Sequence, residues 1–460
     1  MGRMGSTVAL VLVLAGLGAY IYFVESKKPA PGVEPSEKVF TVEADAINEI
    51  TVTAGGETTT LVKKDTGWQV TSPIQTDADP TETASLVTNL SSMTLSRVVD
   101  ENAPDLAPYG LAEPAIKVAF KAEGGAGGEI HLGETTPTMG DLYATSPGGR
   151  RVFLVSSYIE TTFDKKTFDL RDKKIVKFER DKADSVEIVR GDERVRLTRT
   201  DSEWRVEHPV TGRADYATVE GLLTRLSSAN MSEIKEDDAS DLKPYGLDAP
   251  SMRITVGAGS SQTVLELGNM DGDKPLGRDR ARSLVFALDT TLNDDLKRPF
   301  DDYLKKDLFE SRPFSATQVK LTRNTDGAAK TWTFAKAKDG DTDKWTMTPD
   351  GGAATDADRA KVDELLNKLT ALRVTAFVDR SRPAGLDAPV LDVSVTYDTD
   401  KTERVRVGRV GDKRYGNRDG EQATGEVDGA AVQGVLDALE AALAPPAPAA
   451  STDAPATPKQ

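Results

Sequence analysis

Hydrophobic and polar positions repeat along this chain in the same order three times. Each copy has an alternating strand around a tryptophan, at Trp68, Trp204 and Trp345. A proline and a polar turn follow, and apolar residues then recur at intervals of three and four, the pattern of an amphipathic helix that buries one stripe. Self-similarity at a fixed period predicts three copies of one unit. The stripes are Leu86, Val87, Leu90 and Met93; Val219, Leu222, Leu223 and Leu226; and Val362, Leu365, Leu366, Leu369 and Leu372.

The residues in front of each predicted helix are those that begin helices. Asp79 followed by Pro80 suits an N-cap and a first helical residue, and Asp215 and Asp358 take the cap region in the other copies. These residues therefore place the start of each helix.

A second signature follows each helix, a Tyr-Gly-Leu turn with a proline three residues later. Glycine is expected to take a left-handed position there, and proline to start the next strand. The third copy departs from the pattern, because Ala384 stands where Tyr109 and Tyr245 stand. Alternating strands and a Leu-Gly or Val-Gly step come next. The turns are residues 109–114, 245–250 and 384–389, and the steps are Leu132-Gly133, Leu267-Gly268 and Val407-Gly408.

Each copy therefore reads as three strands, a helix, the turn and four strands. Because the strand connections are short, this order predicts an α+β fold with a mostly antiparallel sheet. Residues 168–173 close the first copy and residues 300–305 the second, whereas a short helix near residues 430–443 ends the third. The predicted boundaries are 7–25 for a transmembrane anchor, 26–39 for a linker, 40–178, 179–313 and 314–440 for the three repeats, the last divergent, and 441–460 for a disordered Pro/Ala-rich tail.

Residues 8–24 form an uncharged apolar run near the N-terminus. As a helix this run would be roughly 26 Å long, a little less than a bilayer core. A cleaved signal peptide is the alternative, but no small-x-small cleavage site follows the run. Positive charges nearly balance across it, so the prediction that the body is exported rests on the long soluble region that follows. We expect a single-pass protein of the bacterial inner membrane with its body on the periplasmic side.

Composition removes many kinds of chemistry. The chain has 74 acidic and 58 basic residues, no cysteine and two histidines, His131 and His208. The acidic balance argues against a nucleic-acid partner. The absence of cysteine excludes disulfides, thiolate nucleophiles and Cys-ligated clusters, and two histidines cannot supply a multi-histidine metal site. Carboxylate, Ser/Thr, Lys or Tyr chemistry remains, or no chemistry at all.

Several segments that could carry a site have simpler structural interpretations. Residues 339–343 resemble the start of a calcium loop, but Lys344 occupies the position of the usual glycine, which favours a hairpin turn. Residues 124–128 lack the Lys-Ser/Thr of a phosphate loop, the two histidines lie at non-equivalent strand positions, and the tryptophans are expected to pack helix on sheet rather than to line a ligand groove. Paired acids are expected on the surface. We therefore predict no catalytic, cofactor-binding or metal-binding residues; the acid pairs considered are Asp237-Asp238, Asp294-Asp295 and Asp301-Asp302.

The anchor and these motifs together resemble the bacterial family called domain of unknown function 4340. The Trp strand, the Tyr-Gly-Leu turn, the Leu-Gly step and residues 168–172 carry the resemblance, and the second copy repeats most of them. The family implies no established activity; its members resemble membrane-anchored envelope proteins encoded beside ABC-type gliding-motility or export transporters. We therefore expect a non-enzymatic envelope protein that binds or scaffolds a partner, such as subunits of an ABC-type transporter. The alternative is an envelope hydrolase or glycan-binding protein that uses carboxylates.

Overall fold

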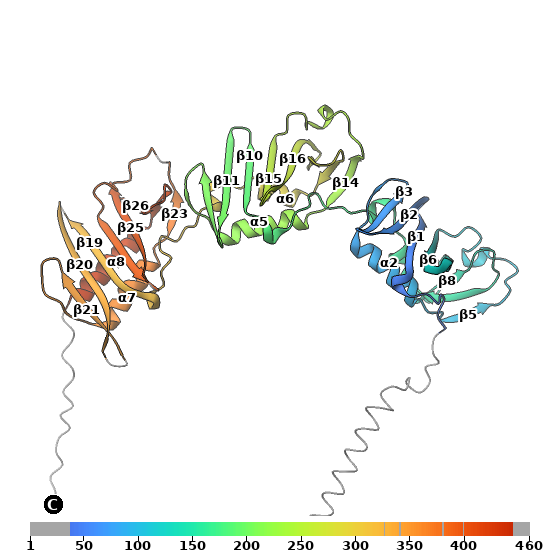
Figure 1. Ribbon diagram of the computed structural model, residues 1–460, viewed down its shortest axis with the longest axis horizontal. Coiled ribbons are helices and arrows are strands. Elements are labelled where there is room, and N and C mark those ends of the chain that lie inside the picture. Colours follow the sequence, from blue (N-terminus) through green and yellow to red (C-terminus); the bar gives the residue numbers. More distant parts are fainter. Residues whose placement is uncertain (1–36, 326, 340–341, 380, 399, 445–460) are drawn as a thin grey trace, which may run out of the picture. The chain divides into compact units, whose positions relative to one another are not determined.

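The computed structural model describes residues 37–325, 327–339, 342–379, 381–398 and 400–444. These residues contain three nine-stranded sheets in which the neighbouring strands with an assigned register are antiparallel (Figure 1). The chain divides into two compact units, one ending at Lys173 and the other beginning at Lys174. The predicted α+β fold with three sheet units is confirmed.

The first copy forms a sheet of order β4-β3-β2-β1-β6-β7-β8-β9-β5. Seven strands match the predicted ones, and the two at the sheet edges were missed because strands of two and four residues are too short to show an alternating pattern. The strands are β1 (Ile47–Ala54), β2 (Glu57–Lys64), β3 (Gly67–Ser72), β4 (Thr76–Asp77), β5 (Arg97–Asp100), β6 (Ile116–Ala122), β7 (Gly127–Thr135), β8 (Asp141–Thr145) and β9 (Val152–Ser156).

The second and third copies repeat this strand order without change. The second sheet has β10 (Ser185–Arg190), β11 (Glu193–Thr200), β12 (Glu203–His208), β13 (Gly212–Arg213), β14 (Met231–Glu236), β15 (Met252–Ala258), β16 (Ser261–Asp271), β17 (Lys274–Asp279) and β18 (Val285–Leu288). The third sheet has β19 (Ala316–Thr325), β20 (Ala328–Asp339), β21 (Thr342–Pro349), β22 (Thr355–Ala357), β23 (Val374–Phe377), β24 (Leu391–Tyr397), β25 (Lys401–Val410), β26 (Lys413–Arg418) and β27 (Thr424–Val427).

One amphipathic helix lies on one face of each sheet: α2 (Pro80–Ser92), α5 (Tyr216–Ser228) and α7 (Arg359–Thr370) (Figure 1). The predicted N-caps are confirmed, because the side chains of Asp79, Asp215 and Asp358 each accept a hydrogen bond from a backbone N–H of the first turn. Most of each predicted stripe is buried, and each buried Leu or Val contributes roughly 1.5–3 kcal/mol. The buried stripe residues are Leu86, Leu90 and Met93; Val219, Leu222, Leu223 and Leu226; and Val362, Leu365, Leu366, Leu369 and Leu372.

The turn signature and the Leu-Gly step turn out to be two halves of one contact. Gly110, Gly246 and Gly385 have positive φ values of 67°, 66° and 66°, as predicted. The carbonyl of the preceding residue then lies against the glycine of the step. A Cβ would lie 2.1 Å from this carbonyl oxygen at Gly133 and at Gly268, and 2.0 Å at Gly408. The backbone makes this contact, which explains why Ala384 can replace tyrosine in the third copy.

The copies differ in how they end. In the first, α3 (Ile159–Phe163) and α4 (Thr167–Leu170) lead into the closing segment, and in the second α6 (Thr290–Leu296) does so. In the third, the predicted terminal helix is confirmed as α8 (Gly429–Leu443), which packs along α7 (Figure 1). Residues 441–443 therefore belong to this helix and not to the tail, because the buried stripe of α8 continues to Ala442.

The predicted anchor at residues 7–25 and the tail from residue 445 lie outside the described residues. Among the described residues, none of the helices is long and apolar enough to span a bilayer.

Candidate functional site

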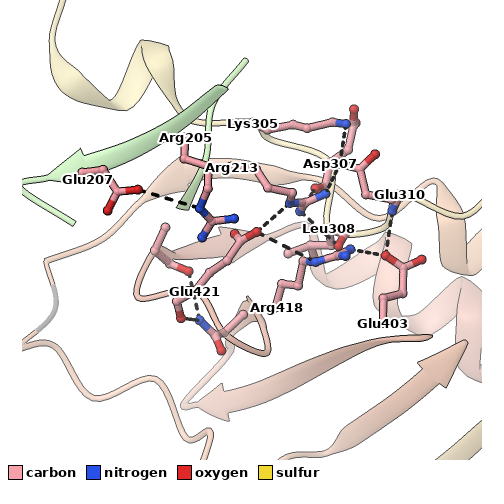
Figure 2. Close-up of polar contacts among 12 residues, drawn as sticks. Arg205, Glu207, Arg213, Lys305, Asp307, Leu308, Glu310, Glu403, Arg418 and Glu421 are labelled. Atoms are coloured by element: carbon pink, nitrogen blue, oxygen red, sulfur yellow. Dashed lines mark hydrogen bonds and ion pairs between the residues drawn. The ribbon is translucent and has the colours of Figure 1, made fainter. Parts of the chain in front are cut away.

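A network of charged side chains, several of them buried, lies where the second and third copies meet (Figure 2). It is built around Arg213, the last residue of the short edge strand β13. Arg213 pairs across the sheet with Arg205, the residue that follows the signature tryptophan. The same cross-strand position holds Asp77 in the first copy and Asp356 in the third. The arginine is therefore a departure of the second copy from the repeat.

Arg213 is enclosed by residues from both copies. Its Nε donates to Oε1 of Glu421 at 2.6 Å and its Nη1 to Oε1 of Glu310 at 2.6 Å. Its Nη2 donates to the carbonyl of Asp307 at 2.7 Å (Figure 2). The side chain is 9% exposed. A buried guanidinium is stable only when its donors find fixed acceptors, and this arrangement supplies them from two carboxylates and the backbone.

A second ion pair lies beside the first. The carboxylate of Glu403 is fully buried and forms an ion pair with Arg418. It also accepts hydrogen bonds from the backbone N–H groups of Glu310 and Ser311, both at 2.8 Å. Nε of Arg418 lies 3.9 Å from Oε1 of Glu421, which joins the two pairs into one network (Figure 2).

Backbone and apolar contacts surround these charges. The carbonyl of Thr211 accepts hydrogen bonds from the N–H groups of Gln422 at 2.8 Å and Ala423 at 3.2 Å. Ala423 belongs to the hydrophobic core of the second copy although it lies in the third. A Cβ on Gly212 would lie 3.2 Å from Cβ of Ala423. The turn before Arg213 is thus pressed onto the loop that carries Glu421.

The electrostatics of this junction favour permanent ion pairs. Burial acts to lower the pKa of Arg213, but the carboxylates of Glu421 and Glu310 outweigh it and raise the pKa above its ordinary value. Burial acts to raise the pKa of Glu310, but Lys305 and Arg213 outweigh it and lower the pKa. Groups held charged in this way are poor proton donors and acceptors near neutral pH. The arrangement is suited to fixing two sheets together.

The paired acids considered from the sequence have different surroundings in the structure. Asp295 is buried and bound by Arg225 and by Arg298, the latter at 2.9 Å. Burial and the neighbouring charge of Asp302 raise the pKa of Asp301. The remaining members of these pairs, Asp237, Asp238 and Asp294, are exposed.

The loop candidates are hairpins, as predicted. Asp339 pairs with Thr342 at the end of the β20–β21 ladder, the pairing of a hairpin. The glycine run 124–128 leads into β7, so no helix follows it. Within the described ranges, no three His, Asp or Glu side chains gather as a metal site.

The tryptophans belong to the packing of helix on sheet. Trp204 and Trp345 are each 2% exposed and lie in the cores of their copies, and Trp68 packs against the core of the first. Nε1 of Trp204 donates to Glu220 on α5 at 2.9 Å, and the guanidinium of Arg199 lies 5.5 Å from the ring centroid. The packing interpretation is confirmed for Trp204 and Trp345.

The residues of the junction were not predicted from the sequence, although one of them carries a signal. Arg213 stands where the other copies have aspartate, and Glu403 stands where β16 has Thr263. Arg213 departs from an aspartate that the other two copies share, whereas the position of Glu403 differs in all three copies and is Gly128 in the first. Only Arg213 therefore carries a signal that the sequence could have shown.

No curated protein and no solved structure matches the chain. One family, described as "Domain of unknown function (DUF4340)", matches residues 68–212 and again residues 204–389. The first match begins at Trp68 in the first copy and ends in the second, and the second match begins at Trp204 in the second copy and ends in the third. Because together they cover more than half of the chain, the protein belongs to the DUF4340 family.

Proposed function

We propose that this protein is a non-enzymatic scaffold of the bacterial cell envelope. An N-terminal helix at residues 7–25 would anchor it in the inner membrane, and the three copies would bind partners on the periplasmic side. The partner class that we propose is a subunit of an ABC-type transporter.

The observation that carries this proposal is the junction around Arg213. The residues shared by all copies serve folding, through the helix caps, the buried stripes and the glycine contacts. The charged residues particular to the second and third copies instead hold those copies together. A scaffold needs a fixed spacing between its binding surfaces, and a buried network with neighbouring backbone hydrogen bonds supplies it.

The first test is purification of full-length, C-terminally tagged protein from native membranes in mild detergent, with quantitative mass spectrometry. We expect transporter subunits in a fixed ratio to the tagged protein. Arg213→Ala should reduce this ratio, whereas Arg194→Ala, which removes an exposed arginine paired with Glu187 in the same sheet, should leave it unchanged. Recovery of the protein without envelope subunits would contradict the proposal, and hydrolysis or binding of envelope polymers would then be assayed.

Orientation needs a separate test. Alkaline phosphatase fused after Gln460 should be active if the body is periplasmic. An inactive phosphatase together with a fluorescent cytoplasmic fusion would place the body on the other side.

A further inference from the structure

In each of the first two copies, a short extended segment pairs with the edge of the sheet beside its shortest strand, β4 or β13. These closing segments are residues 170–172 and 303–305. Arg171 pairs opposite Ala78 in the first copy, and Leu304 pairs opposite Ala214 in the second. Two backbone hydrogen bonds fix each segment. They are Asp79 N–H to Leu170 C=O at 2.9 Å and Asp172 N–H to Asp77 C=O at 2.8 Å, and then Asp215 N–H to Tyr303 C=O at 2.8 Å and Lys305 N–H to Arg213 C=O at 2.9 Å.

Each closing segment also supplies a large apolar side chain. Leu170 and Tyr303 are both 0% exposed and lie in the hydrophobic cores of their copies. The segment therefore completes the core as well as the hydrogen bonding of the edge.

The third copy has the same edge, but none of its described residues forms this segment. Asp356 of β22 pairs with Thr346, the residue that follows Trp345 in β21. Asp77 and Arg213 pair in the same way with the residues that follow Trp68 and Trp204, so the three edges have the same register. The outward-facing backbone groups are thus the C=O of Asp356 and the N–H of Asp358. Within the described ranges, neither is bonded to a closing strand.

The apolar side chains at this edge are also less buried than the equivalent side chains of the first two copies. Met347 pairs with Phe334 as Val70 pairs with Leu61, and Trp332 lies two residues before Phe334. Trp332, Met347 and Ala357 are half-buried, whereas their counterparts in the other copies are buried. Those counterparts are Thr59, Val70 and Ala78 in the first copy and Val195, Val206 and Ala214 in the second.

We propose that an extended segment of a partner protein docks on this open edge, defined by Asp356, Asp358, Trp332, Met347 and Ala357. It would add to the sheet as another strand, a common mode of peptide recognition. A large apolar residue would accept from the N–H of Asp358 through its carbonyl, and the residue two positions later would donate to the C=O of Asp356.

The closing segments indicate the partner's sequence pattern. Both have a large apolar residue followed by lysine three positions later, Leu170 with Lys173 and Tyr303 with Lys306. Nζ of Lys173 lies 3.9 Å from the carboxylate of the N-cap Asp79, and Asp358 is the N-cap of the third copy. The pattern is therefore apolar-x-x-Lys, and a basic segment also suits a chain with a net charge of -16.

The ends of the chain that lie outside the described residues are poor candidates for the occupant. Val24 and Lys27 have the apolar-x-x-Lys spacing, but Val24 belongs to the proposed membrane anchor at residues 7–25. Residues 445–460 contain no Leu, Ile, Val, Met or aromatic residue, so they cannot supply the apolar side chain. The closing segments of the first and second copies are bound within their own sheets, so a second copy of this chain would first have to release one. These points favour a different protein as the occupant.

The test uses the full-length protein in detergent and a fluorescent peptide with the sequence of residues 298–306. We expect saturable binding by fluorescence anisotropy, and at least tenfold weaker binding by the same peptide with Tyr303→Asp. Trp332→Glu and, independently, Ala357→Arg in the protein should each weaken binding at least tenfold. Val410→Glu changes a 41% exposed apolar residue on β25, which four strands separate from β22 in the same sheet, and should have no effect. Circular dichroism would establish that each variant folds.

Hydrogen exchange adds a backbone readout, since the bound peptide should slow exchange at residues 356–358. Absent binding, or binding that neither edge variant changes, would overturn the proposal. Binding only after removal of residues 445–460 would instead identify the tail as the occupant. Dimerisation that Trp332→Glu abolishes would identify a second copy. The inference rests on the proposed binding role, but the peptide assay can fail while transporter subunits still co-purify, so the two failures are distinguishable.

Discussion

The junction between the second and third copies gives the sharpest prediction, which is that Arg213→Ala uncouples them. Breaking a buried ion pair by removing one partner costs about 3–5 kcal/mol when the other charge stays uncompensated. Here each carboxylate keeps a cation nearby, since Lys305 lies 2.7 Å from Glu310 and Arg418 lies 3.9 Å from Glu421. Because these contacts compensate part of the charge, we expect a loss of about 2–4 kcal/mol in the free energy of opening the junction.

The assay is hydrogen exchange of the full-length protein at residues 211–214 and 421–424, combined with urea unfolding followed by tryptophan fluorescence. Exchange should accelerate at both segments in Arg213→Ala, and the unfolding transition should broaden or split as the copies separate. Arg194→Ala is the matched control, because its arginine is 48% exposed and should contribute no more than about 1 kcal/mol. If Arg213→Ala changed the opening free energy no more than this control, the argument that the network joins the copies would be refuted.

Three further predictions concern groups whose surroundings the structure defines. Burial acts to raise the pKa of Glu310, but its cationic neighbours lower it below the ordinary 4.5. Its contribution to stability is therefore present above that value and lost as the pH falls through the folded pKa. The free energy of opening the junction, obtained from exchange rates corrected for the intrinsic pH dependence of amide exchange, should fall below about pH 4.5 and stay constant from about pH 5 to 7. Gly268→Ala should destabilise the protein by about 1–3 kcal/mol, because its Cβ would lie 2.1 Å from a carbonyl oxygen. Gly221→Ala should stabilise it by about 0.5–1 kcal/mol, because this position lies inside helix α5 and a Cβ there would have no atom within 4 Å. The two variants should therefore shift the melting temperature in opposite directions. The hydroxyl of Tyr303 is buried with no hydrogen-bond partner among the described residues, and burial raises its pKa to about 12. Tyr303→Phe should raise the melting temperature by an amount equivalent to about 1 kcal/mol, and a fall would indicate a partner for the hydroxyl.

Much of the fold follows from local patterns that need no knowledge of long-range contacts. The helix stripes and their aspartate caps are properties of a few consecutive residues, and Asp79, Asp215 and Asp358 all cap helices as predicted. The glycine of the turn is likewise predictable from its need for positive φ. The strands β4, β13 and β22 were not predictable, because strands this short exist only where a neighbouring strand supplies their hydrogen bonds.

The candidate site could not be predicted from patterns along the sequence. Arg213 and Glu421 are both charged residues in polar stretches, and such residues are ordinarily exposed. They are buried because two copies meet there, and that contact is a property of the folded chain. The departure of Arg213 from the repeat could have marked it as unusual, but its partners Glu310 and Glu421 could not have been named.

The sequence by itself determined the number of copies, the order of their main elements and the positions that each copy buries, because hydrophobic periodicity and capping act over short distances along the chain. Only the tertiary structure decided which charges the second and third copies share and which sheet edge stays open. Those features depend on residues that are far apart in sequence and meet only after each copy has folded. Three copies with nearly the same local pattern thus acquire different edges, since the segment that closes the first and second copies is replaced by α8 in the third.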